Sequence, residues 1–307
     1  MPAVSPRARI LLGVAFLVSA LWTLTLLDTA GKLLALAGYH VVFIAWARYT
    51  LNTLLMTVTI APLYRRRTGK SILKSTQPRL QIIRAVILLS STLIFFSVLK
   101  IVPLAEGTAM NFCAPLIVLA VSPWLLGERS RPARWIAVAV GFTGMLIVIR
   151  PGGAIVPLGV ALGILSAATF AALAIMNRKL NQRDDPLVTL FYGGLIGMLG
   201  SSALVPFFWS SHVPDLREGL ILASTGVTST LGHFLLNSAY KHAEASLLTP
   251  FVYLQVVSAT LMGWIVFGQL PDRMTFIGIA IICTSGMAIA YVEHRRFHRL
   301  QLDKVPG

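Results

Sequence analysis

The sequence predicts an all-α integral membrane protein with ten transmembrane helices, arranged as two inverted five-helix repeats with both termini cytoplasmic. Three observations lead to this prediction. The composition is too hydrophobic for a soluble domain, the apolar runs are long enough to cross a bilayer, and features of the first half of the chain recur in the second.

The composition excludes a soluble domain. Of the 307 residues, 56% are hydrophobic and 12% charged, with a mean hydropathy of +0.78. Soluble domains carry about 25% charged residues, so this chain cannot cover a core of its size with a polar surface. The apolar runs are long and do not alternate with polar residues, which favours helices over a β-barrel. Cys113 and Cys283 lie in apolar runs without disulfide or metal spacing, and no cofactor is expected.

Ten apolar runs predict the membrane spans, because about twenty apolar residues cross the hydrocarbon layer. They lie at residues 10–33, 40–62, 80–101, 103–126, 133–149, 156–177, 186–209, 217–239, 247–268 and 273–292. The first run follows Arg7 and Arg9 in the manner of a signal peptide. It continues too far and lacks a convincing cleavage site, so we expect it to be a retained span.

The lysine and arginine residues predict the orientation. With both termini in the cytoplasm, twenty Lys and Arg residues fall on the cytoplasmic side and five on the other. The cytoplasmic set includes Arg84, near the start of the third run, and the external set includes Lys32. Cytoplasmic loops are enriched in Lys and Arg, so the termini are expected inside. The net charge of +15 then reflects topology, and no nucleic-acid partner is expected.

The two halves of the chain share short sequence matches. "LGVA" occurs at 12–15 and again at 158–161, an offset of 146, and "KIVPLAEGT" at 100–108 matches "KHAEASLLT" at 241–249, an offset of 141. These matches predict a first repeat at 1–150, a second at 151–295 and a basic cytoplasmic tail at 296–307. Five spans per repeat is an odd number, so the second copy must be inverted. Inverted repeats with a site at their interface are typical of secondary transporters.

Two longer segments resemble a known family. "APLIVLAVSPWLLGE" (114–128) and "TPFVYLQVVSATLMGWIVFGQLPD" (249–272) resemble the ends of the two domains of EamA-type members of the drug/metabolite transporter superfamily. The combination of Asp28, Lys32 and Arg48 is similar to the branch that includes S-adenosylmethionine and riboflavin carriers. Gln269 departs from the family, which often has Glu there, whereas Glu128 matches it. The resemblance implies ten helices and transport of a small, partly aromatic metabolite.

Small residues predict close helix packing. Gly159, Gly163, Ala167 and Ala171 step by four along the sixth run, and Thr189, Gly193, Gly197 and Ser201 do so along the seventh. Such residues let helix backbones approach each other, within one bundle or at a moving or dimer contact.

Asp28, Lys32 and Arg48 are charges within the first two apolar runs. A charge at the bilayer centre costs roughly 2.5–3.5 kcal/mol on insertion scales. A helical rise of about 1.5 Å per residue places Asp28 and Arg48 in the outer half of the membrane. One interpretation is a structural ion pair between these two. The other is that Arg48 offers its cation to an anionic substrate group while Asp28 orients it. Lys32 is expected to extend toward the membrane surface.

Other polar and aromatic residues near mid-span complete a predicted small-molecule site, because such sites combine apolar and aromatic walls with a few polar groups. With Asp28 and Arg48, the predicted substrate-binding residues are Trp22, Tyr49, Asn111, His233, Asn237, Tyr253 and Gln255. An ordinary histidine titrates near neutral pH, so His233 is either a proton carrier or a hydrogen-bonded core residue.

These features predict a secondary transporter that moves a small organic metabolite or drug-like compound across the cytoplasmic (inner) membrane by alternating access. The expected partners are this small molecule and the lipid bilayer, and the chain is expected to act as a monomer or homodimer. No nucleotide-binding motif points to ATP as the energy source. The alternatives are an intramembrane enzyme, a channel or a scaffold protein. The residues contain no placed nucleophile and base and no ring of filter groups, so an enzyme is not expected.

Overall fold

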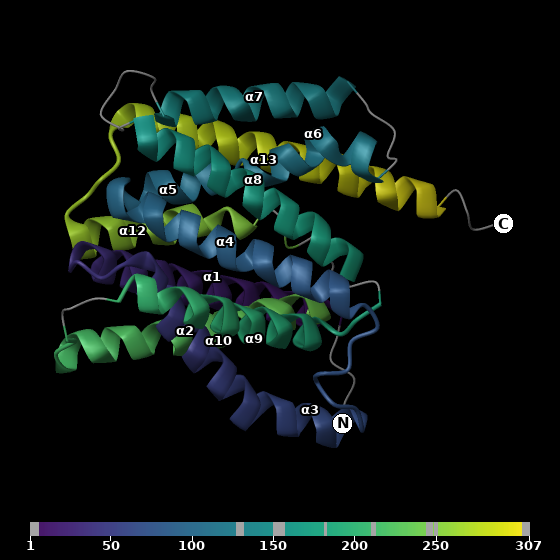
Figure 1. The fold of residues 1–307 in the computed structure, drawn as a ribbon. Coiled ribbons are helices and arrows are strands. Elements are labelled where there is room, and N and C mark those ends of the chain that lie inside the picture. The colour runs from purple at the N-terminus through teal and green to yellow at the C-terminus, as the bar shows by residue number, and fades with distance from the viewer. Residues whose placement is uncertain are drawn as a thin grey trace.

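The computed structural model is a bundle of helices that run side by side (Figure 1). It describes residues 6–126, 132–149, 157–180, 183–209, 213–243, 248 and 251–302. The regular elements are α1 (Pro6–Leu36), α2 (Val41–Leu55), η1 (Met56–Ile60), α3 (Ala61–Thr68), α4 (Pro78–Ile101), α5 (Leu104–Asn111), α6 (Ala114–Leu126), α7 (Pro132–Ile149), α8 (Pro157–Leu180), α9 (Pro186–Leu204), η2 (Val205–Phe207), α10 (Leu216–His242), α12 (Leu254–Phe267) and α13 (Arg273–Leu302). All regular elements among these residues are helical, which confirms the predicted all-α class.

Six helical stretches among the described residues are long and apolar enough to cross a membrane. They are Ile10–Leu36, Val41–Thr68, Pro78–Ile101, Pro157–Asn177, Pro186–Phe207 and Leu216–His242. Four shorter apolar helices occur at Leu104–Val118, Trp135–Ile149, Leu254–Phe267 and Arg273–Ala288. The ten predicted runs therefore correspond to six full-length and four shorter apolar helices, and part of the ninth run lies outside the described residues.

Two of the predicted runs have local irregularities. The fourth run divides into α5 and α6 at Phe112 and Cys113, two residues before Pro115. Proline has no N–H and therefore cannot donate a hydrogen bond to the carbonyl four residues earlier. In the turn between the two helices, the amide of Cys113 donates to the Met110 carbonyl at 3.1 Å. The second run passes through η1, one π-helical turn between α2 and α3. Extra-residue turns of this kind are frequent at functional sites.

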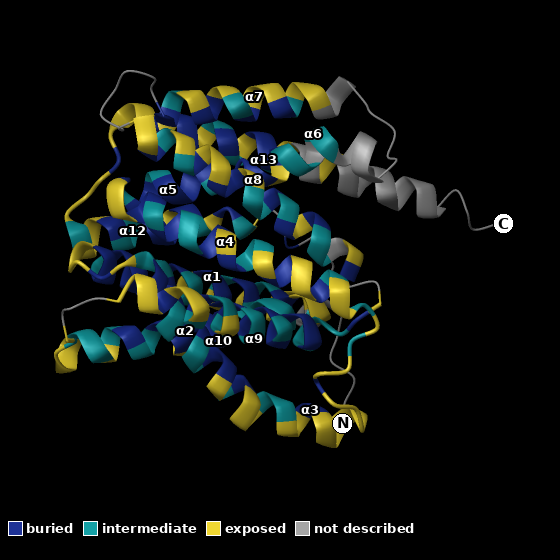
Figure 2. Ribbon diagram, in the orientation of Figure 1, coloured by how far each residue is buried: buried dark blue, intermediate teal, exposed yellow. Residues whose placement is uncertain are grey.

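The outward faces of the bundle are apolar. Figure 2 shows exposed residues along the outer sides of α4 and α7 and over most of α3. Large hydrophobic side chains such as Leu11, Ile136 and Ile265 are more than 60% exposed. Monomeric soluble proteins do not leave so much apolar surface uncovered. The bundle therefore belongs in lipid, and the chain is a multi-pass membrane protein.

Helices far apart in sequence pack together. The closest neighbours are α1 with α10, α4 with α8, α2 with α9, and α7 with α13, while α2 also contacts α10 and α4 contacts α9. Glycines permit the closest approaches: a Cβ on Gly144 of α7 would lie 2.8 Å from the Gly278 carbonyl of α13. The first helix begins and the last helix ends at the same end of the bundle, on the right of Figure 1. We call this the termini end.

Candidate functional site

Arg48 lies inside the bundle on α2 and is only 7% exposed. Its Nε donates to the Ser229 hydroxyl of α10 at 3.2 Å, and its Nη1 donates to the Thr92 hydroxyl of α4 at 3.4 Å. The guanidinium also lies over the rings of Tyr49, at 5.1 Å, and Phe96, at 5.9 Å. Neutral hydroxyls and aromatic faces therefore surround this cation.

Asp28 is near Arg48 but does not form an ion pair with it. In the part of the chain that the structure describes, no carboxylate lies within 4.0 Å of the Arg48 guanidinium, although its charge acts on Asp28. The structure thus shows no direct ion pair between Asp28 and Arg48 among the described residues, and both interpretations of these charges remain predictions. On α1, Leu24 packs against Gly232 of α10 and Thr25 bonds to a hydroxyl of α12. Asp28 follows both by one turn and is half-buried, so it lies on the same face of α1 as these two residues.

α10 presents a polar stripe to this region. Ser229, His233 and Asn237 are spaced by four residues and therefore lie along one face of the helix. Ser229 receives the bond from Arg48, and the charge of Arg48 also acts on His233. His233 and Asn237 are both half-buried, and the structure gives their side chains no hydrogen-bond partner among the described residues.

Tyr49 of α2 contacts α4 beside Arg48. Its hydroxyl lies 2.7 Å from that of Thr92 and 3.4 Å from the Leu88 carbonyl, and the residue is 2% exposed. A Cβ on Gly197 of α9 would lie 2.5 Å from the Tyr49 ring. The predicted small-residue stripe of the seventh run therefore serves packing within the bundle, because it makes room for side chains that surround Arg48.

Arg84 is the main site residue that the sequence analysis missed. It was assigned to the cytoplasmic loop, but it lies on α4 inside the bundle and is 7% exposed. Its Nε donates to Asn177 Oδ1 of α8 at 2.8 Å, and its Nη1 donates to the Thr189 carbonyl of α9 at 3.4 Å. The charge of Arg84 also acts on His233. In the sequence, Arg84 stands six residues after Pro78, farther into the apolar run than the basic residues of the preceding loop.

Lys32 corrects another expectation. It does not extend to the membrane surface, because it is 2% exposed and its Nζ donates to the Val102 carbonyl at 2.7 Å. The ammonium also lies 5.2 Å from the centre of the Phe267 ring, and the charge of Glu106 acts on it. Lys32 therefore stabilises the turn between α4 and α5, where Pro103 interrupts the helix.

Four predicted residues have no described contact with Arg48, Asp28 or His233. Asn111 accepts a hydrogen bond from Ser166 of α8 at 2.8 Å. Tyr253 packs on Phe112, with ring centres 5.1 Å apart, and lies against Gly286 of α13. Gln255 is half-buried on α12. Trp22 is 37% exposed on the α1 face that also exposes Leu11 and Leu26, about 120° around the helix from Asp28. The structure thus brings Asp28, Arg48, Tyr49 and His233 into one region, and Asn237 follows His233 by about one turn of α10.

A hydrogen-bonded carboxylate connects two loops at the termini end. Asp184, before α9, accepts bonds from the amide and hydroxyl of Thr76, at 2.8 and 2.7 Å, from Gln81 at 2.9 Å, and from the Ser75 hydroxyl. Burial alone would raise the pKa of Asp184, but these bonds outweigh it and lower the pKa from 3.8 to about 2. The loop before α4 is therefore held to the loop before α9.

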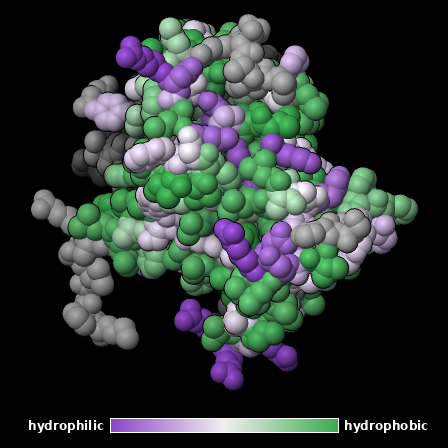
Figure 3. Space-filling model, turned by 90° about the vertical axis from the view of Figure 1, so that its left-hand side faces the viewer, coloured by the Kyte–Doolittle hydropathy of each residue, from purple (hydrophilic) through white to green (hydrophobic). Residues whose placement is uncertain are grey.

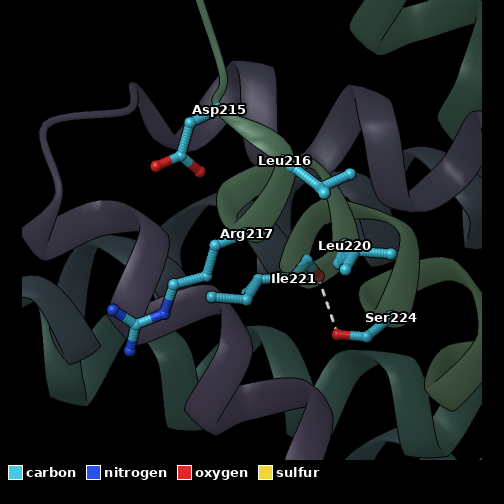
Figure 4. A pocket seen from close by; sticks show the side chains of 6 residues that line it. All are labelled: Asp215, Leu216, Arg217, Leu220, Ile221 and Ser224. Atoms are coloured by element: carbon cyan, nitrogen blue, oxygen red, sulfur yellow. Dashed lines mark hydrogen bonds between the residues drawn. The ribbon is translucent and has the colours of Figure 1, made fainter.

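The opposite end has its own polar contact and a shallow surface depression. The Tyr39 hydroxyl donates to Glu218 of α10 at 2.9 Å. Figure 3 views this end and shows hydrophilic side chains scattered over a largely hydrophobic surface. The depression is formed by the first turns of α10, where the side chains drawn come from one helix (Figure 4). It is lined by Asp215, Leu216, Arg217, Leu220, Ile221 and Ser224. These residues do not include Asp28, Arg48, Tyr49, His233 or Asn237, which we call the central polar group.

Comparisons with known proteins agree with this architecture. The model of the EamA-like transporter family matches residues 157–291. The chain is 28% identical over 227 residues to an S-adenosylmethionine uptake transporter of Rickettsia bellii, covering 74% of this chain and 77% of that protein. It is 27% identical over 233 residues to a riboflavin transporter of Rhizobium johnstonii, covering 75% and 76%.

Two further matches extend the comparison. An uncharacterized transporter of Helicobacter pylori is 30% identical over 204 residues, covering 64% of this chain and 68% of that protein. A crystal structure of another protein aligns with a TM-score of 0.62 at 22% identity, covering 95% of this chain and 99% of that one, and so shares the fold. The described residues contain no group of three or more His, Cys, Asp or Glu that could hold a metal ion. The chain belongs to the EamA-like transporter family and is a membrane transporter rather than an enzyme.

Proposed function

We propose that this protein is a secondary carrier that moves a small organic metabolite across the bacterial inner membrane by alternating access. The observation that carries the proposal is the central polar group around Arg48, which lies inside an apolar bundle and is bonded only to neutral groups. Relatives named for S-adenosylmethionine and riboflavin transport favour a partly aromatic metabolite of similar size. Asp28, Tyr49, His233 and Asn237 complete the proposed binding site with Arg48.

The helix contacts support two repeats, at 1–150 and 151–295, followed by the basic tail at 296–307. Exchanging α1 with α8, α2 with α9, α4 with α10 and α7 with α13 maps the most extensive contacts between these helices onto one another, although the α1–α4 contact has no comparable α8–α10 counterpart among the described residues. Under this exchange the α1–α10 contact becomes α8–α4, and the α2–α10 contact becomes α9–α4; both are present. This symmetry is expected of inverted repeats that rock about a site at their interface.

The distribution of basic residues supports cytoplasmic termini. Impermeant maleimide labelling in intact cells tests this orientation. Lys70→Cys, in the loop at the termini end, should remain unlabelled until the cells are opened, whereas Val213→Cys, at the opposite end, should label at once. Both native cysteines, Cys113 and Cys283, lie within the bundle and provide a low background. The reverse labelling pattern would invert the proposed topology.

Uptake into proteoliposomes tests the transport proposal. We expect saturable uptake of S-adenosylmethionine or riboflavin that is accelerated by the same unlabelled compound inside the vesicles. Arg48→Gln should reduce the uptake by at least about tenfold, because hydrogen bonds to a charged group are among the strongest in a binding site. Arg65→Gln, an exposed arginine on α3, is the matched control and should transport normally. Flux that does not saturate, or that lacks counterflow, would contradict a carrier. The same preparation, analysed by size, distinguishes the monomer from the homodimer.

A further inference from the structure

We infer that Arg84 binds an anionic group of the transported molecule, so that the substrate is an organic carboxylate or phosphate ester; this rests on the proposed carrier function. Arg84 lies closer to the termini end than Arg48 and belongs to neither of the interpretations that the sequence suggested for the buried charges. Its surroundings, its charge balance and its position relative to the central polar group carry the inference.

The guanidinium of Arg84 has unused hydrogen-bonding capacity. An arginine head carries five N–H donors. The structure gives Arg84 one bond to Asn177 at 2.8 Å and one longer bond to the Thr189 carbonyl at 3.4 Å, and both acceptors are neutral. A neutral side chain could make these two helix-to-helix bonds without bringing a charge into the membrane. The charge of Arg84 therefore has another purpose than connecting α4 to α8 and α9.

The charge balance of the buried residues points the same way. The charge of Glu106 acts on Lys32, and Arg48 acts on Asp28, so each of these cations has a nearby carboxylate. Among the described residues, no carboxylate forms an ion pair with Arg84. A buried charge without an opposite charge is strongly unfavourable, and a ligand anion would supply what is missing.

The position of Arg84 connects it to the central polar group. Arg84, Leu88 and Thr92 follow one another at steps of four along one face of α4, which spans about 12 Å along the helix axis. At the far end of this strip Thr92 bonds to Arg48, and between the ends the Tyr49 hydroxyl approaches Leu88. The charges of both arginines act on the half-buried His233. The two cations thus lie toward opposite ends of this face of α4, and both act on His233.

A glycine of α9 allows the position of the Arg84 head to be tested without removing its charge. A Cβ on Gly193 would lie 2.6 Å from Arg84 Nη1, so Gly193→Ala must displace the guanidinium. The displaced group is the far end of a flexible side chain, and alanine is a good helix former, so the helix is expected to be retained. Gly219 of α10 has nothing within 4 Å of its Cβ position, and Gly219→Ala is the matched control.

The experiment measures the thermal shift of the purified full-length protein with two matched pairs of compounds. The pairs are riboflavin 5′-phosphate with riboflavin, and S-adenosylmethionine with decarboxylated S-adenosylmethionine. The wild type should bind the member that carries the phosphate or carboxylate group of at least one pair at least about tenfold more tightly, a factor typical of a charge-assisted contact. Arg84→Gln and Gly193→Ala should abolish or reduce this preference. The controls Gly219→Ala and Arg79→Gln, an exposed arginine on the same helix, should retain it.

The outcomes separate this inference from the carrier proposal. Equal binding by the wild type of the members with and without the anionic group overturns the inference, as does a preference that survives unchanged in Arg84→Gln. If Arg84→Gln does not fold, the comparison of Gly193→Ala with Gly219→Ala decides. Charge-selective binding without saturable uptake in vesicles would reject the carrier proposal and leave the anion site in place. Saturable uptake without a preference for the anionic group would support the carrier proposal and reject the anion site at Arg84.

Discussion

Replacing Asp184 by Asn is expected to destabilise the protein by about 2 kcal/mol at neutral pH. The carboxylate accepts hydrogen bonds from Ser75, Thr76 and Gln81, which hold the loop before α4 to the loop before α9. Burial alone would raise the pKa of Asp184, yet the bonds lower it from 3.8 to about 2. At about 1.4 kcal/mol per pKa unit, this difference gives the expected loss. Asp184 is 8% exposed, so solvent screening is small.

The pH dependence of this loss follows from the direction of the shift. A carboxyl group whose pKa is lowered by folding stabilises the native state above its unfolded pKa of 3.8, and the stabilisation disappears as the pH falls toward 2. The difference between wild type and Asp184→Asn should therefore be full at pH 5–7 and close between pH 4 and 2. Thermal unfolding in detergent, followed by tryptophan fluorescence, measures it.

Asp185→Asn provides the control for this prediction. The Asp185 side chain accepts a hydrogen bond from the Leu187 amide at 2.8 Å and caps α9. Asparagine caps helices about as well as aspartate, so Asp185→Asn should unfold like the wild type. The reasoning is refuted if Asp184→Asn and Asp185→Asn are equally stable at pH 7, or if the loss caused by Asp184→Asn is the same at pH 3 as at pH 7.

Three further substitutions test other contacts by the same unfolding assay. Gly197→Ala places a Cβ 2.5 Å from the Tyr49 ring and should destabilise the protein by about 1–3 kcal/mol; an unchanged melting temperature would show that the ring moves freely. Lys32→Met leaves the Val102 carbonyl without its bond and should cost about 1–3 kcal/mol, whereas a stabilised variant would show that burying the ammonium outweighs the bond. Burial and a hydrogen bond to a carboxylate raise the pKa of Tyr39 from 10.0 to about 12. Its stabilisation should thus be complete below pH 10 and lost toward pH 12, and Tyr39→Phe should flatten that part of the profile.

The helical class and the order of the apolar segments could be predicted because hydropathy is a local property of the sequence. A run of about twenty apolar residues has few alternatives in a membrane. The break between α5 and α6 could only partly be predicted. Pro115 has no N–H to donate to the carbonyl of Asn111, four residues earlier, but the tight turn at Phe112 and Cys113 depends on bonds that several residues make together.

The site was harder to predict, because it depends on which faces of the helices meet. Arg48, Asp28 and His233 stand out as polar residues in apolar runs, and the structure places them together. Trp22 was predicted from its depth along the first apolar run, which is all that the sequence indicated. In the structure it lies on an exposed face of α1, away from Asp28. Arg84 was missed for the opposite reason. Its sequence position near a basic loop suggested topology, whereas its contacts with α8 and α9 place it inside the bundle.

The absence of a direct contact between Asp28 and Arg48, within the described part of the chain, bears on how such a site could work. A buried ion pair is difficult to break, because separating it leaves two charges in a medium of low dielectric constant. Arg48 instead bonds to the hydroxyls of Ser229 and Thr92, on α10 and α4, which correspond to one another under the proposed repeat exchange. Net contributions of such bonds are small enough for a ligand anion to replace them. A carrier must bind and release its substrate in every cycle, and a cation held by exchangeable neutral partners from both halves meets that requirement better than one fixed by a carboxylate.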